Sequence, residues 1–160
     1  MKRLSDCLIS GGKSYEDLKY EALVHSNLAD QLSYDPIGGM GFLHGVVIDA
    51  HFSEKGREGR LWTVLQETQN QRNGAVHGLG VDENTALVCE WEVCRVLGTG
   101  GVWGVNVGQS VMGGGSMMGV KALYIIQGDI LTLNDWRVFF GSQKKEIEEN
   151  NNTEIETNRF

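Results

Sequence analysis

The stretch from residue 46 to residue 60 constrains the fold more than any other part of the chain. Its first three residues, 46–48, are β-branched and predict a short buried strand. Asp49 and His51 follow at the point where that strand leaves its sheet. In open α/β sheets, ligands bind at the carboxyl ends of the strands. The order of these residues therefore predicts a binding site at this strand end.

Three cations, Lys55, Arg57 and Arg60, follow the strand and alternate with glycines. Apolar residues recur at helical spacing between residues 61 and 68, which predicts a helix over residues 57–71. Its first turn would bring backbone N–H groups and arginines to one anion. Alternatively, the cations only cap and solvate the helix, although basic side chains are disfavoured at a helix N-terminus. The acid, the imidazole and the cations together indicate an anionic or carboxylate-bearing substrate.

An acidic corner, Asp82–Glu83, lies between two strands predicted within residues 78–89. Two adjacent carboxylates between strands are normally a solvated turn, and this pair gains a functional meaning only if it lies near His51. The chain has 22 glycines and one proline, which indicates many tight strand ends and close backbone approaches. Further strands are predicted over residues 95–97, 102–107, 123–126 and 131–133.

The length and composition limit the class of protein. At 160 residues the chain forms at most one domain and can bury a core. The net charge of −7 argues against nucleic acid as a partner, and no apolar run is long enough to cross a membrane. The three cysteines, Cys7, Cys89 and Cys94, have no CxxC spacing, and the N-terminus has no signal peptide. Reduced thiols and a cytoplasmic location are therefore expected.

Two other kinds of catalytic site fit the residues less well. Cys7 lies upstream of His51 and would be its nucleophile, but the segment over residues 4–9 lacks a glycine-rich elbow. Asp49 and His51 would be ligands of a metal hydrolase, but no second histidine has ligand spacing nearby. We therefore expect no metal and no cofactor.

Two sequence blocks resemble a known family. The first, residues 41–61, contains Gly-Phe-Leu, then Val-Ile-Asp-Ala-His-Phe, Gly-Arg and Gly-Arg-Leu. The second, residues 78–86, reads Gly-Leu-Gly-Val-Asp-Glu-Asn-Thr-Ala. In this order and separation the blocks resemble the cyanophycinases, which are peptidase E-like serine peptidases. The likeness spans roughly residues 4–133.

The resemblance implies a fold. It is an α/β fold of the class I glutamine amidotransferase type, flavodoxin-like, with a mostly parallel sheet and flanking helices, and with the N-terminal half missing here. Residues 1–141 would form this partial domain, and residues 142–160 a disordered acidic and polar tail. A sheet that lacks its first strands exposes an edge and an apolar face. We therefore expect association, for example as a homodimer, or poor solubility.

The resemblance also implies a Ser-His-Glu triad, in which His51 is the general base and Glu83 orients it. The family's substrate-binding positions are matched by Asp49, Lys55, Arg57 and Arg60. Asp49 would hold the guanidinium group of a β-aspartyl-arginine peptide, and the basic residues would hold its carboxylates.

The chain departs from the family's pattern in three respects. Ala50 stands where the family usually has glutamine. Lys55 replaces the usual arginine, which keeps the charge but loses the bidentate fork. The family's Gly-Thr-Ser-Ala-Gly-Ala elbow, which carries the nucleophile, is missing, and no Gly-x-Ser-x-Gly occurs in the chain. Two hypotheses follow: a cyanophycinase-type serine exopeptidase whose serine is absent from this chain, or a non-catalytic fragment or pseudoenzyme that keeps an anion- or peptide-binding pocket.

Overall fold

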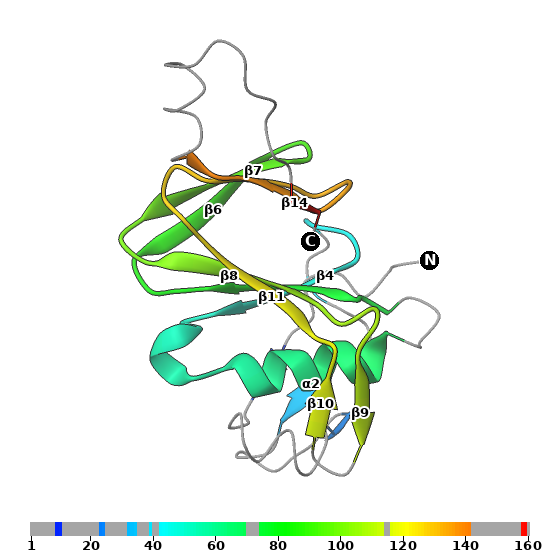
Figure 1. Ribbon diagram of the computed structural model, residues 1–160. Helices are drawn as coiled ribbons and strands as arrows, with labels where there is room; N and C mark the ends of the chain where they lie inside the picture. Colours follow the sequence, from blue (N-terminus) through cyan, green and yellow to red (C-terminus); the bar gives the residue numbers. More distant parts are fainter. Residues whose placement is uncertain are drawn as a thin grey trace.

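A computed structural model of the chain describes residues 9–10, 23–24, 32–34, 39, 42–69, 74–113, 116–141 and 158–159. Most of these residues form three layers: helix α2 (Glu58–Thr68), a sheet of four strands and a second sheet of five strands (Figure 1). The helix covers one face of the four-stranded sheet, and the second sheet lies over the opposite face (Figure 1).

The first sheet contains a strand–helix–strand unit. Its strands are β4 (Val46–Ala50), β5 (His77–Val81), β8 (Gly101–Asn106) and β11 (Lys121–Ile126), in the order β11-β8-β5-β4. β4 and β5 are parallel, with Val47 opposite Gly78, because α2 returns the chain to the starting end of the sheet. β8 is antiparallel to β5, and β11 is antiparallel to β8. The carboxyl ends of β4 and β5 therefore lie side by side.

The second sheet is antiparallel throughout. Its strands are β6 (Thr85–Glu90), β7 (Val93–Gly98), β12 (Ile130–Thr132), β13 (Arg137–Phe139) and β14 (Asn158–Arg159), in the order β14-β13-β12-β7-β6. The chain passes from the first sheet to the second through residues 82–84 and returns through residues 99–100. A two-residue turn at Trp91 and Glu92 joins β6 to β7.

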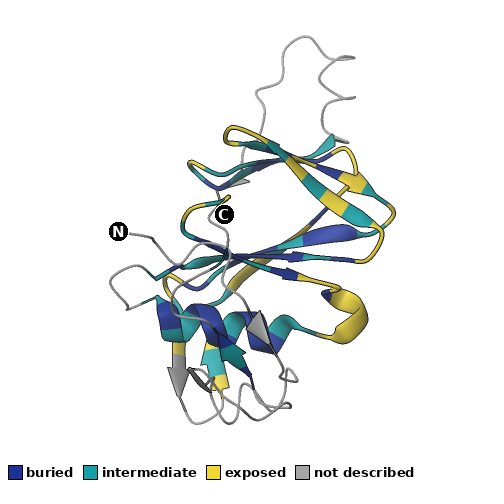
Figure 2. Cartoon of the chain, turned by 180° about the vertical axis from the view of Figure 1, so that it is seen from behind, coloured by how far each residue is buried: buried dark blue, intermediate teal, exposed yellow. Residues whose placement is uncertain are grey.

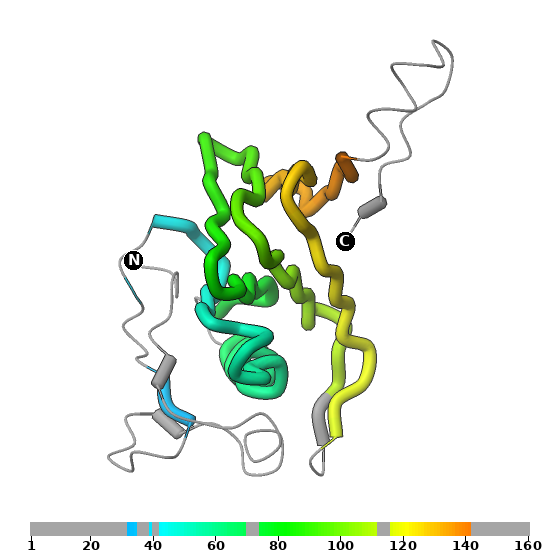
Figure 3. The backbone as a smooth tube through the Cα atoms, turned by 90° about the vertical axis from the view of Figure 1, so that its left-hand side faces the viewer, coloured from blue at the N-terminus to red at the C-terminus, as the bar shows by residue number. Residues whose placement is uncertain are grey.

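Smaller elements complete the described part. β1 (Ile9–Ser10), β2 (Leu23–Val24) and β3 (Ser33–Tyr34) form a three-stranded sheet in the order β1-β3-β2. β9 (Val111–Gly113) and β10 (Ser116–Met118) form an antiparallel ribbon that extends the β8–β11 pair (Figure 3). A short 3₁₀ helix, η1 (Ser53–Lys55), follows β4, and Gly56 ends it with a left-handed φ of 56°.

Two hydrophobic clusters fill the spaces between the layers. The first cluster, between α2 and the first sheet, contains Leu32, Tyr34, Val47, Phe52, Leu61, Val64, Leu65, Ala75, Val105 and Val107. The second cluster, between the two sheets, contains Val46, Leu79, Cys94, Val96, Val102, Ile125, Leu131, Trp136 and Val138. Successive side chains of a strand point to opposite faces, so β4 contributes Val46 to one cluster and Val47 to the other. Burial is greatest between the layers, and the turn after β4 is exposed (Figure 2).

The predicted fold class is wrong. The described residues do not form a mostly parallel, flavodoxin-like sheet with flanking helices, because β4 and β5 are the one parallel pair in the two large sheets. Parallel neighbours need a crossover of a dozen or more residues, usually a helix. After β5 the chain instead makes short connections, such as residues 82–84 and 91–92. Connections this short join antiparallel strands or lead from one sheet to the other, so the described residues after β5 form antiparallel strands rather than further strand–helix–strand units.

Several elements were predicted correctly. The strand at residues 46–48 is β4, the helix expected over residues 57–71 is α2, and the strands on either side of the acidic corner are β5 and β6. The later predicted strands correspond to β7, β8, β11 and β12. The predicted tail, residues 142–160, lies outside the described residues except for β14, which pairs with β13.

The expectation of reduced cysteines is wrong for two of the three. Cys89 and Cys94 form a disulfide, and Cys94 is fully buried. These residues face each other across the β6–β7 hairpin, so the hairpin register brings together two cysteines that lie five positions apart. Cys7 lies outside the described residues. None of the described helices has the length and apolar character needed to cross a membrane.

Candidate active site

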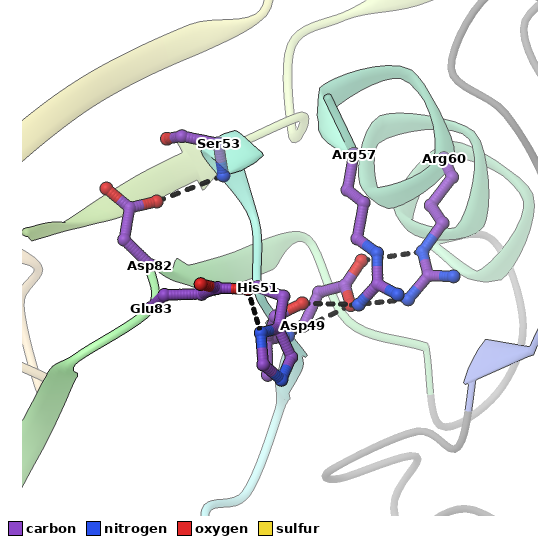
Figure 4. Close-up of polar contacts among 8 residues, drawn as sticks. Asp49, His51, Ser53, Arg57, Arg60, Asp82 and Glu83 are labelled. Atoms are coloured by element: carbon purple, nitrogen blue, oxygen red, sulfur yellow. Dashed lines mark hydrogen bonds and ion pairs between the residues drawn. The ribbon is translucent and has the colours of Figure 1, made fainter. Parts of the chain in front are cut away.

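The candidate site lies at the carboxyl ends of the parallel strands β4 and β5. Asp49 and His51 come from the end of β4, and Asp82 and Glu83 follow β5 directly (Figure 4). This is the edge at which a strand–helix–strand unit presents its ligands. The acidic corner, whose significance depended on its distance from His51, is therefore part of the same site.

A histidine–glutamate pair forms the centre of the site. The Nδ1 atom of His51 lies 2.8 Å from the Oε1 atom of Glu83. Both side chains are exposed, at 55% for His51 and 44% for Glu83. Because a carboxylate only accepts, the contact favours the tautomer in which Nδ1 carries the proton. The other ring nitrogen, Nε2, then has the lone pair that a general base needs.

The backbone of His51 has an unusual conformation. Its φ is +51°, in the left-handed region that non-glycine residues rarely adopt and that costs about 1–3 kcal/mol. Buried residues lie on both sides of His51 in the sequence: Asp49 two positions before it and Phe52 directly after it. The Phe52 amide also donates to the carbonyl of Val81, at 3.2 Å. The imidazole is thus carried by a strained residue between two anchored ones.

Gly80 makes room for the second of these anchors. A Cβ atom at Gly80 would lie 2.4 Å from the ring of Phe52, closer than any real contact. Phe52 is fully buried in the first cluster. The absence of a side chain on β5 therefore lets the residue after His51 pack directly onto the sheet.

Asp49 is bound within the protein by two arginines. Arg60 donates from Nε to Oδ2 at 2.7 Å and from Nη2 to Oδ1 at 2.5 Å, which is a bidentate pair. Arg57 donates from Nη1 to Oδ1 at 3.1 Å and, from the same nitrogen, to the carbonyl of Ala50 (Figure 4). The side chains of Asp49 and Arg60 are 3% and 7% exposed. The pair thus ties the end of β4 to the first turn of α2.

A second carboxylate, Asp82, organises the other side of the corner. It accepts hydrogen bonds from the Ser53 amide at 3.0 Å, the Tyr124 hydroxyl at 2.6 Å and the Gly101 amide at 3.3 Å. Burial alone would raise the pKa of Asp82, but the hydrogen bonds from Ser53, Tyr124 and Gly101 outweigh it and lower this pKa. The hydrogen bond to Asp82, together with burial, raises the pKa of Tyr124 to about 12. Asp82 therefore remains ionised, and Tyr124 keeps its proton over the ordinary pH range.

Residues of η1 connect the two carboxylates of the corner to their surroundings. The Oε1 atom of Glu54 accepts from the backbone amide of Glu83 at 2.9 Å, which fixes the peptide that carries the Glu83 side chain. The Oγ atom of Ser53 accepts from the indole of Trp103 at 3.0 Å. Lys55, the last residue of η1, is exposed.

The predicted site residues thus fall into two groups. His51 and Glu83 contact each other, while Asp49, Arg57 and Arg60 form a network of ion pairs. Lys55 belongs to neither group and is exposed. Sequence reasoning did not identify the roles of Ser53, Glu54, Asp82, Trp103 and Tyr124. The proximity of the first three to His51 and Glu83 in the sequence was a usable signal, whereas strand pairing alone brings Trp103 and Tyr124 to the site.

The chemistry available here is proton transfer. Within the described part of the chain, no three histidine, cysteine, aspartate or glutamate side chains are grouped as ligands for a metal ion. A scan against known protein families finds no family model that matches the chain.

Proposed function

We propose that this chain supplies the base and the orienting acid of a serine-type exopeptidase that resembles the cyanophycinases and hydrolyses β-aspartyl-arginine peptides. The observation that supports the proposal is the 2.8 Å contact between Nδ1 of His51 and Oε1 of Glu83. Glu83 would hold the imidazole in the tautomer that leaves Nε2 able to accept a proton. The sequence blocks around both residues are the second support.

In the proposed reaction, a serine hydroxyl attacks the β-aspartyl carbonyl carbon, and Nε2 of His51 takes the hydroxyl proton. The same nitrogen then gives that proton to the departing amine, which leaves an acyl-enzyme. Water, deprotonated in turn by His51, hydrolyses the ester. The serine of the resemblance has no counterpart in this chain, because no Gly-x-Ser-x-Gly motif is present.

Substrate binding is proposed at Lys55. Lys55 is exposed, four residues after His51 in the sequence, and would meet a substrate carboxylate as a single point charge. Asp49, Arg57 and Arg60 occupy the family's other binding positions, and in this chain they are paired with one another. A substrate guanidinium that reaches Asp49 must therefore replace Arg57 or Arg60.

A non-catalytic module is the second candidate. The observation in its favour is the missing serine motif, since a His–Glu pair without a nucleophile cannot form an acyl-enzyme. Such a module would bind a peptide or an anion and release it unchanged.

Incubation of the chain with β-Asp-Arg, together with a segment that supplies the missing Gly-x-Ser-x-Gly serine, separates the two candidates. The exopeptidase predicts release of aspartate and arginine, loss of turnover with a serine-directed phosphonate, and loss of turnover in His51→Gln. Binding of the dipeptide by calorimetry without turnover would favour the module. An experiment that shows no turnover and no binding of the dipeptide would refute both candidates. Arg95→Gln, an exposed cation on β7, is the matched control and should behave as the unchanged chain does.

The cytoplasmic location and self-association belong to the proposal as well. The Cys89–Cys94 disulfide is the observation against a cytoplasmic location, because cytosolic thiols are normally kept reduced. β11 lies at the edge of the first sheet, and its Tyr124 and Ile126 are exposed, which favours association. A homodimer would be detected by sedimentation velocity.

A further inference from the structure

We propose that Arg57 is a positioning residue for His51, and that it acts through the carbonyl oxygen of Ala50 rather than through the substrate. The proposal deepens the proposed function, since it explains how the base is aimed. Its evidence is the set of contacts between β4 and the start of α2, together with the backbone conformation of His51.

The first step is that Asp49 provides a fixed anchor. Its two oxygens receive the bidentate pair from Arg60, and both side chains are buried. Its Oδ1 atom also accepts from the amide of Ala50 at 2.9 Å. A buried carboxylate with this many donors cannot rotate without leaving charges unpaired, which is costly.

The second step is that Arg57 connects the fixed carboxylate of Asp49 to the peptide bond that precedes His51. Its Nη1 atom donates both to Oδ1 of Asp49 and to the carbonyl of Ala50. That carbonyl belongs to the peptide unit whose nitrogen is the amide of His51. Arg57 stands at the N-cap of α2, and its side chain is 21% exposed, so its guanidinium is held between helix and strand.

The third step concerns the direction of the His51 imidazole. Its side chain is exposed, as is that of Glu83, so core packing does not fix the direction of the imidazole. The direction depends on the backbone, and a φ of +51° is a conformation that such a residue leaves when its surroundings permit. A hydrogen bond on the preceding carbonyl resists that change. Figure 4 shows the side chain of Arg57 beside the end of β4.

The side-chain chemistry required is that of arginine. One guanidinium nitrogen carries two hydrogens in a rigid plane and can serve both oxygens at once. A glutamine at this position is neutral and cannot form an ion pair with Asp49. A lysine keeps the charge, but its compact ammonium group has no planar fork to match the two acceptors.

The test is the tautomer of His51, measured by ¹⁵N NMR of histidine-labelled protein, with His51→Gln used to assign the signal. Free neutral imidazole prefers the tautomer with the proton on Nε2, whereas the contact with Glu83 favours Nδ1. We expect Arg57→Gln to lower the Nδ1-H to Nε2-H ratio several-fold, Arg57→Lys to restore it in part, and Arg95→Gln to leave it unchanged.

An unchanged ratio in folded Arg57→Gln would overturn the proposal and would leave Arg57 as a substrate contact. If the glutamine variant fails to fold, Arg57→Lys decides, and a ratio equal to that of the unchanged chain would overturn the proposal. The measurement needs no substrate. A chain that shows the expected tautomers but no hydrolysis of β-Asp-Arg would therefore count against the proposed function alone.

Discussion

The ring of Phe52 lies directly against the backbone of Gly80, at a distance that no side chain on β5 would allow. Phe52 follows His51, and Gly80 precedes the acidic corner by two residues. The contact therefore fixes the relative positions of the two segments that supply the histidine–glutamate pair.

Gly80→Ala should destabilise the protein. The new methyl group would overlap the ring of Phe52, and overpacking of this kind costs roughly 1–3 kcal/mol. The free energy of unfolding in urea measures the effect. Gly108→Ala is the control, because its nearest neighbour is a side-chain oxygen of Asn106 at 3.2 Å. Equal stability of the two variants would contradict the proposed packing.

The two carboxylates of the site should differ strongly in their contribution to stability. Asp49→Asn removes the negative charge from a buried ion pair with Arg60, which should cost about 3 kcal/mol or more. Glu83→Gln removes an exposed pair with His51 and should cost less than about 1 kcal/mol. Unfolding curves at pH 7 compare them, and a larger loss for Glu83→Gln would be inconsistent with the observed burial.

Tyr124 should be the residue that ionises late. Its folded-state pKa of about 12 lies above the ordinary 10.0, so its contribution to stability is complete below pH 10 and is lost as the pH rises through about 12. Ultraviolet absorbance of tyrosinate should show a step near pH 12 that Tyr124→Phe removes. Asp82→Asn should move that step to lower pH, since the hydrogen bond to Asp82 is its main cause. A step that persists in Tyr124→Phe would belong to another residue.

His77 should make the protein sensitive to acid. Its ring stacks on Trp136, with centroids 4.0 Å apart, and burial lowers its pKa from 6.5 to about 4. A lowered folded-state pKa means that the contribution to stability is complete above pH 6.5 and is lost as the pH falls toward 4. His77→Phe keeps the stack and removes the titration, so the loss of stability between pH 7 and pH 4.5 should be smaller. His44→Gln, at an exposed position, should retain the original slope.

The Cys89–Cys94 disulfide should make a modest contribution to stability. It closes a loop of few residues, for which the chain-entropy estimate is about 2 kcal/mol. Unfolding with and without dithiothreitol should differ by this amount, and the double variant Cys89→Ala/Cys94→Ala should not respond to the reductant. Two additional free thiols in the unreduced, unfolded protein would show that the bond does not form.

Local patterns in the sequence were sufficient for the unit that carries the site. The β-branched run at residues 46–48 and the apolar spacing of residues 61–68 identified β4 and α2. The positions of Asp49, His51 and Glu83 at strand ends followed from the same patterns. Strand direction was beyond such reasoning, because it depends on which strands pair over long distances. The family resemblance supplied a parallel sheet that the short connections after β5 do not permit.

The ion-pair partners of the charged residues could not be predicted from the sequence either. Asp49 was expected to be open to substrate, whereas Arg57 and Arg60 surround it. The spacing of 8 and 11 residues gives no hint of contact until α2 is folded back against β4. The cysteine pair was missed for a related reason, since hairpin register rather than a known spacing motif brings the two together.

Glu83 lies in the three-residue link between the first sheet and the second. The carboxylate that contacts His51 therefore belongs to the link between two separately paired sheets. A change that loosens the second cluster, such as truncation of Leu131, would be transmitted to the histidine without touching it. The alignment of His51 and Glu83 thus depends on how the two sheets pack against each other.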